Sequence, residues 1–322
     1  MDKSRDVLNR QEEILAPPDP ADYRVLTRLA TNPGNHFAVG FGGGAAHGLA
    51  GNSALAALLD ELGLRSHVKE VWGTSAGAIV GAAWSGGLHG RDILERIRVR
   101  ARRPLDFAYR DLLLRLLRRR GLPEGLIRGR HIREALERGL PVRRIEECAI
   151  PFRAIACTDD GLCRKVVFRE GPLLPAVLAS TAVPGVFFPV PDWNGAEYGY
   201  MDGGIVEKTP LLSIMEEHVR SGRTTHLFVV CTHFDSEGRV EPPKGFLNRL
   251  LAGIHCAEDD SWSHQLERAR ATPGCKFVPL NPRMERGGMF EMEVVPFNYL
   301  WARRAFKEQL SNAGLPPRLY GR

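Results

Sequence analysis

Residues 71–80, VWGTSAGAIV, place a serine between two glycines, where an apolar run ends and a helix of small residues begins. Gly73, Ser75 and Gly77 fit the pattern G-x-S-x-G, which sets a nucleophilic serine on a sharp turn from a strand into a helix. Bulky neighbours would clash at such a turn. The stretch therefore predicts an α/β fold with Ser75 at the end of a strand, although five residues alone also fit a glycine-rich turn with an incidental serine.

Strand and helix patterns alternate on both sides of this turn. HFAVGF is an expected strand entering a glycine loop, residues 48–62 carry apolar residues at helical spacing, and HVKEVWG is a second expected strand. Further strands are expected in PFRAIACTD, RKVVF, EYGYMDGG, THLFVVCTH and CKFVP, and helices in PLLPAVLAS, PLLSIMEEHVRSG and YLWARRAFKEQL. This alternation favours a mainly parallel central sheet with helices on its faces.

The 322 residues contain no repeat, low-complexity tract or clear linker. We therefore expect one domain over residues 36–322, preceded by an extension, 1–35, in which the prolines of APPDP break any helix. Within the domain, the motifs fall in 36–235, and residues 236–322 are expected to mix helix, loop and a short strand.

Composition narrows the class of protein. A hydrophobic content of 43% and a charged content of 25% are typical of soluble globular proteins. No window holds the ~18 uninterrupted apolar residues of a membrane span, and the charged, proline-rich start does not resemble a secretory signal peptide. The six cysteines show no metal-binding spacing. We expect a cytoplasmic protein without a structural metal.

Positive charge is concentrated between Arg91 and Arg144, where 17 arginines face 7 acidic residues. Such a region suits an anionic membrane, an acidic substrate or nucleic acid, but no aromatic interleaving or reader motif supports nucleic acid. In YRDLLLRLLRRRGL the leucines share one helical face and the arginines lie mainly opposite. This pattern is typical of a helix lying on a bilayer and equally of a helix packed on the core. Peripheral membrane contact through residues 91–144 is one expectation.

Three glycine-marked sites follow one another, each at the end of an expected strand: GGGAAHG at 42–48, GTSAG at 73–77 and DGG at 202–204. The first would let backbone N–H groups converge on one point, and the following helix N-terminus adds partial positive charge, as in an oxyanion hole. A dinucleotide-binding loop is disfavoured, because His47 occupies its third glycine position.

Together the three motifs resemble the patatin-like phospholipase family. That family has a glycine-rich oxyanion loop ending in Arg/Lys-Gly, then G-x-S-x-G, then D-G-G or D-G-A, and LASTAVPGVFFPV is similar to its serine-alanine-proline block. The resemblance covers roughly residues 36–235. It implies a three-layer α/β/α sandwich of patatin type and a lipid acyl hydrolase, acting on phospholipid or lysophospholipid without cofactor or metal.

The resemblance also implies roles for individual residues. Ser75 would be the nucleophile and Asp202 the base of a catalytic dyad working through an acyl-enzyme. The oxyanion hole would be formed by backbone amides of Gly42, Gly43, Gly44 and Ala45. Supporting positions would be His47, Gly48, Gly73, Gly77, Gly203 and Gly204.

The chain departs from the family pattern in three places. His47 replaces the usual Arg or Lys and lacks the permanent charge and bidentate reach of arginine, so weak or pH-dependent activity is expected. With the loop shifted by one residue, Ala45 stands where a glycine is common. EKTP, residues 207–210, replaces an asparagine-rich turn, with a consequence that the sequence does not reveal.

Two alternatives stay open. An α/β-hydrolase with a Ser-Asp-His triad also carries G-x-S-x-G, but its oxyanion loop follows an earlier strand and it gives DGG no role. Its base would come from His218, His226, His233, His255 or His264. The second alternative is a non-catalytic patatin-like protein that binds lipid or a partner, against which the retention of Ser75 and Asp202 speaks.

Overall fold

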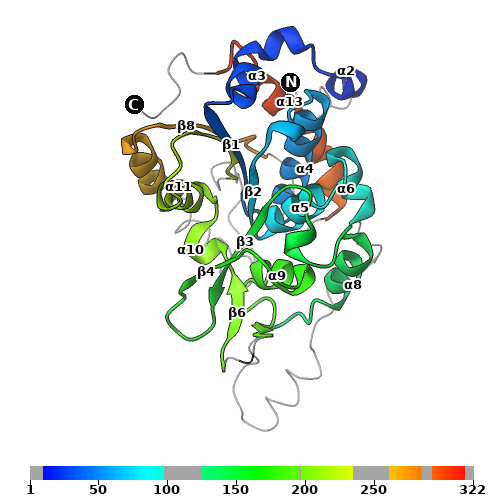
Figure 1. Ribbon diagram of the computed structural model, residues 1–322. Coiled ribbons are helices and arrows are strands. Elements are labelled where there is room, and N and C mark those ends of the chain that lie inside the picture. Colours follow the sequence, from blue (N-terminus) through cyan, green and yellow to red (C-terminus); the bar gives the residue numbers. More distant parts are fainter. Residues whose placement is uncertain are drawn as a thin grey trace.

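A computed structural model describes residues 10–97, 125–193, 195, 197–234, 261–284 and 292–315. In this part of the chain, eight strands form one sheet with the order β5-β6-β3-β2-β1-β7-β8, and β4 also pairs with β3 (Figure 1). The strands are β1 Asn35–Phe41, β2 Glu70–Thr74, β3 Phe152–Thr158, β4 Lys165–Phe168, β5 Val190–Pro191, β6 Gly199–Asp202, β7 His226–Thr232 and β8 Cys275–Leu280.

The contiguous block β3-β2-β1-β7-β8 is parallel throughout, whereas β4, β5 and β6 are antiparallel to their neighbours. The parallel strands are buried on both faces and read as nearly continuous apolar runs, as parallel strands do. The predicted α/β class with a mainly parallel central sheet is confirmed.

Helices cover both faces of the sheet and give three layers (Figure 1). One face carries α3 Arg24–Thr31, α4 Ala45–Glu61, α5 Ala76–Ser85, α6 Gly90–Arg96, α8 Arg130–Gly139, α9 Leu173–Ser180 and α13 Val295–Leu310. The other carries α10 Gly204–Glu207, α11 Leu211–Arg220 and a helix over residues 261–271.

Alternation along the strands divides the core between these faces. In β1, Phe37, Val39 and Phe41 join the cluster under α4 and α5, while Ala38 faces the cluster under α11. In β2, Val71 belongs to the first cluster and Trp72 to the second. Successive side chains of a strand point to opposite faces, so each strand contributes to two cores.

The N-terminal residues of the described chain pack on its last helix. Ile14, in α2 (Gln11–Leu15), is buried, and its carbonyl accepts a hydrogen bond of 2.8 Å from Nε of Arg303 on α13. Tyr23, at the end of a 3-10 helix over Pro20–Tyr23, donates its hydroxyl to the carbonyl of Lys307 at 3.1 Å. Residues 10–31 are thus fixed to the face of the sheet that α4 covers.

Part of the arginine-rich region, residues 98–124 with the stretch YRDLLLRLLRRRGL, lies outside the described residues. Within the described ranges, no helix combines the length and apolar character needed to cross a bilayer.

Candidate active site

Ser75 lies on a strained turn between β2 and α5. Its backbone has φ 54° and ψ −124°, a conformation that a non-glycine residue adopts only at a cost. Such strain gathers at functional sites, where the surrounding structure holds it in place. The side chain is half-buried at the N-terminus of α5.

The two flanking glycines allow close backbone packing at this turn. A methyl group on Gly73 would lie 2.5 Å from the carbonyl oxygen of Gly77, and one on Gly77 would lie 2.0 Å from that of Phe41. Neither contact is possible, so both positions require glycine. The predicted sharp turn from strand to helix is what the structure contains.

Ser180, which the sequence pattern alone did not indicate, fixes the backbone of Ser75 by a hydrogen bond. The N–H of Ser75 donates to Oγ of Ser180 at 2.9 Å, and that hydroxyl donates to the carbonyl of Ile155 at 2.6 Å. Ser180 ends α9 and Ile155 lies in β3, so the turn is tied to both elements. Ser180 lies in LASTAVPGVFFPV, and this was the signal that could have revealed it.

Asp202 ends β6, two strands away from Ser75. In the sheet, Thr74 is in register with Ile155 of β3, and Asp202 is in register with its neighbour Ala156. At a spacing of about 4.8 Å per strand, the ends of β2 and β6 are about 10 Å apart. No hydrogen bond joins Ser75 to Asp202 in the described residues, and such catalytic contacts often tighten only with substrate bound.

Asp202 itself is firmly anchored and 4% exposed. Its N–H donates to the carbonyl of Ala182 at 2.9 Å, and its Oδ1 accepts the N–H of Gly204 at 2.7 Å. The thiol of Cys157 points its Sγ at the carbonyl of Asp202, 3.5 Å away. Burial raises the pKa of Cys157 to about 12, and the nearby Cys163 and Asp202 add to the effect, so this thiol keeps its proton and serves as a donor.

The segment after Asp202 connects both other motifs, through the EKTP turn. The carbonyl of Glu207 accepts the hydroxyl of Thr74 at 3.0 Å, directly before Ser75. The carbonyl of Lys208 accepts the N–H of Gly43 at 2.8 Å. One short turn therefore fixes the serine strand and the glycine loop relative to Asp202.

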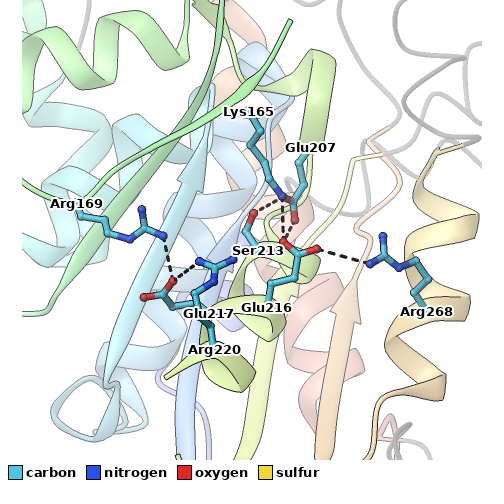
Figure 2. Close-up of polar contacts among 8 residues, drawn as sticks. All are labelled: Lys165, Arg169, Glu207, Ser213, Glu216, Glu217, Arg220 and Arg268. Atoms are coloured by element: carbon cyan, nitrogen blue, oxygen red, sulfur yellow. Dashed lines mark hydrogen bonds and ion pairs between the residues drawn. The ribbon is translucent and has the colours of Figure 1, made fainter. Parts of the chain in front are cut away.

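The Glu207 carboxylate anchors that turn to the elements packed against it and is only 3% exposed. It accepts the N–H of Ser213 at 2.9 Å and the Ser213 hydroxyl, and it pairs with Nζ of Lys165 at 3.1 Å (Figure 2). Lys165 also lies 3.5 Å from Glu216, which is paired with Arg268. The network joins β4, α10 and α11.

In the glycine loop, the N–H groups of Gly42 and Gly43 have hydrogen-bond partners among the described residues of the scaffold, unlike those of the next two residues. Gly42 donates to Oγ1 of Thr232 at 2.8 Å and Gly43 donates to Lys208, so these two groups hold the loop to the scaffold. Both N–H groups are therefore occupied in this structure, and their predicted part in an oxyanion hole stays a prediction. No hydrogen bond joins the N–H groups of Gly44 and Ala45 to a described residue. They open the N-terminus of α4, where helix donors lack internal partners.

The loop lies directly beside the serine. A methyl group on Gly43 would be 3.2 Å from Cβ of Ser75 and 3.7 Å from Cγ of Lys208, whose side chain is almost fully buried. Ala45 has φ 46°, the conformation that glycine adopts freely. The remaining predicted supports also lie here: half-buried His47 and buried Gly48 in the first turns of α4, and Gly203 against the carbonyl of Ile155.

The late histidines make other contacts. His218 is hydrogen-bonded through Nε2 to the carbonyl of Thr225. His226 is the first residue of β7, whereas Ser75 follows the last residue of β2, and His264 is exposed. His233 contacts Oγ1 of Thr209 at 2.9 Å and stacks on Trp262. No hydrogen bond joins any of these four to Ser75, and His255 lies outside the described residues.

The residues of this site can be compared with those of a known protein family. The family model for patatin-like phospholipase matches residues 40–215, which is more than half of the chain and contains all three motifs. The chain belongs to the patatin-like phospholipase family. This membership supports a lipid hydrolase function with lipid as the substrate.

Among solved structures, the patatin-like chain is similar to VipD from Legionella pneumophila, with a TM-score of 0.44 and 14% identity over 85% of this chain and 66% of VipD. It is also similar to the type III effector protein ExoU, with a TM-score of 0.38 and 17% identity over 88% of this chain and 54% of ExoU. The chain thus spans about two thirds of VipD and about half of ExoU. No curated protein sequence matches it.

Proposed function

We propose that this patatin-like chain is a lipid acyl hydrolase of phospholipase A or lysophospholipase type, with Ser75 as nucleophile and Asp202 as base. The observation that carries the proposal is the strained turn at Ser75, with φ 54°, held between the glycine loop and the segment that anchors Asp202. A serine that merely lies in a glycine-rich turn does not need that conformation.

In the proposed reaction, Oγ of Ser75 attacks the ester carbonyl while its proton passes to the Asp202 carboxylate. The C–O bond to the alcohol then breaks, and the alcohol leaves with that proton. Water, giving up a proton to Asp202, attacks the acyl-enzyme and releases the fatty acid, and the Ser75 hydroxyl is restored. Protons and bonds balance without a further reactant.

For the oxyanion, we propose the N–H groups of Gly44 and Ala45, supported by the positive end of α4. Both belong to the loop that lies against Ser75. Losing one such donor typically raises the barrier by about 3–4 kcal/mol. No metal or cofactor is needed by this proposal, because a dyad and backbone donors suffice for ester hydrolysis.

We also propose that the protein works as one domain over residues 36–322 with an extension at 1–35, and that it meets lipid at a membrane surface. The arginine excess of residues 91–144 supports attraction to an anionic bilayer.

The test is fatty-acid release from a panel of phospholipids and lysophospholipids. We expect Ser75→Ala and Asp202→Asn each to abolish release, while the exposed controls Ser66→Ala and Asp92→Asn keep it. Release that survives in Asp202→Asn but not in Ser75→Ala would support a histidine base, with His233→Ala as the next variant. Lipid binding without release by the wild type would support the non-catalytic alternative.

A further inference from the structure

A small cavity of about 110 Å³ lies beside the segment that anchors both proposed catalytic residues. Thr181 and Ala182 form part of its wall and directly follow Ser180, the residue that accepts the N–H of Ser75. The carbonyl of Ala182 accepts the N–H of Asp202 at 2.9 Å. The backbone that forms this part of the cavity wall therefore also holds Ser75 and Asp202 in place.

Another part of the wall comes from the start of α8 and the residues just before it. The N–H groups of Leu126 and Ile127 donate to the carbonyl of Val186 at 3.0 and 2.8 Å, and Ile127 pairs with Phe187. These bonds bring residues 125–129 alongside the chain that follows α9. The apolar lining includes Leu178 of α9, Phe187 and Ile132 of α8.

Two arginines, Arg128 and Arg133, also line the cavity, and both are exposed. They flank the N-terminus of α8, which adds partial positive charge. Arg133 forms no ion pair with a described residue, whereas Arg138 on the same helix pairs with Glu134 at 4.0 Å. Among the described residues, no acidic side chain lines the cavity. An apolar interior with a cationic rim matches an acyl chain that is attached to a phosphate.

We propose that this cavity is a substrate subsite for an anionic phospholipid. The part of the acyl chain near the ester lies against Leu178, Phe187 and Ile132, and the phosphate lies at Arg133 and Arg128. Pockets that enclose a whole small ligand measure roughly 300–1,000 Å³, so this one holds only part of a lipid. The inference rests on the proposed function and adds the substrate class to it.

The experiment uses short-chain phospholipids below their micellar concentration, because a monomer in solution removes the attraction of an anionic bilayer. Initial rates are measured with dihexanoyl phosphatidylglycerol, dihexanoyl phosphatidylcholine and p-nitrophenyl acetate. We expect the wild type to prefer the phosphatidylglycerol. Arg133→Gln should lower kcat/KM on that lipid by about tenfold, mainly through KM, as expected for the loss of a hydrogen bond to a charged group. The other two substrates should change little.

Arg138→Gln is the matched control on the same helix and should leave all three rates unchanged. Ile132→Phe narrows the cavity and should slow both dihexanoyl lipids more than the acetyl ester. Equal rates on the two lipids in the wild type, or an equal loss on both in Arg133→Gln, would overturn the subsite while leaving hydrolysis intact. A wild type without activity on any of the three esters would instead contradict the proposed function.

Discussion

Thr74 donates its hydroxyl to the carbonyl oxygen of Glu207 at 3.0 Å, across 133 positions of sequence. The first residue precedes the proposed nucleophile and the second lies five positions after the proposed base. Lys208, next in the chain, accepts the N–H of Gly43. The EKTP turn, residues 207–210, is therefore the structural connection among all three motifs.

Thr74→Val tests this connection. Valine keeps the shape but leaves a buried carbonyl without its donor, which costs about 1–3 kcal/mol in the free energy of unfolding. Because small displacements of reacting groups are costly, kcat on a soluble ester should fall on the order of tenfold to a hundredfold. Denaturant unfolding and initial rates measure the two effects. Thr74→Ser keeps the donor and should restore both, and Thr272→Val, at an exposed helix end, should change neither.

The sequence predicted those parts of the fold and site that depend on local pattern. Ser75 and its strained turn follow from two glycines at fixed spacing, and the parallel strands follow from their apolar runs. The helix expected over 48–62 begins at Ala45, because the preceding glycine loop enters the helix directly. The directions of β4 and β6 were beyond prediction, since alternation along a strand is the same in parallel and antiparallel pairs.

Contacts between elements that are distant in the sequence could not be predicted either. Nothing near Gly42 in the sequence indicates that Thr232 accepts its N–H, or that Lys208 accepts that of Gly43. Four neighbouring glycines and small residues looked equivalent as oxyanion donors, and only the tertiary partners distinguish Gly44 and Ala45. The places of Ser180 and Arg133 could not be predicted for the same reason. Each is defined by contacts with a segment that is distant in the sequence.

Glu207→Gln should destabilise the turn from its buried side. Glutamine removes the charge that pairs with Lys165 and brings an amide group against the N–H and hydroxyl donors of Ser213. We expect a loss of about 1–3 kcal/mol in the free energy of unfolding, as for other hydrogen bonds to buried charges, together with reduced activity. Glu216→Gln is the control, since Glu216 meets the same Lys165 but is 41% exposed, and its loss should stay within about 1 kcal/mol. Equal losses would contradict the role of burial.

Ala45→Gly should stabilise the glycine loop and keep activity. At φ 46° an alanine pays a steric cost of roughly 1–2 kcal/mol that glycine avoids, and the greater freedom of glycine in the unfolded chain returns about 0.4–1 kcal/mol of this. A net gain of between about 0 and 1.6 kcal/mol in the free energy of unfolding is expected, with the N–H donor unchanged. Arg283→Gly, at the same φ in an exposed segment, should give a similar gain in stability with no role in the site. A loss of activity in Ala45→Gly alone would show that the alanine methyl group shapes the proposed oxyanion hole.

His218 predicts how stability depends on pH. Burial lowers the pKa of this imidazole below its ordinary value, with His36 and Arg223 adding to the effect and the Thr225 hydrogen bond and Glu70 opposing it. The unfolded chain therefore binds a proton at a higher pH than the folded chain. As pH falls below about 6.5, the free energy of unfolding should decrease until the lowered folded pKa is reached.

Glu70 contributes to the pH dependence of stability in a different pH range from His218. Burial raises the pKa of Glu70, but the hydrogen bond with His36 and the charges of Arg153 and Arg223 outweigh it, so its pKa lies below the ordinary value. The stability that Glu70 contributes is complete above its unfolded pKa of about 4.3 and is lost only as pH falls further. Denaturant unfolding between pH 5 and 7 therefore covers the range in which a histidine side chain changes charge and lies above the range of Glu70. His218→Gln should flatten the slope and His264→Gln, at an exposed position, should preserve it; a slope that persists in His218→Gln would assign the proton to another group.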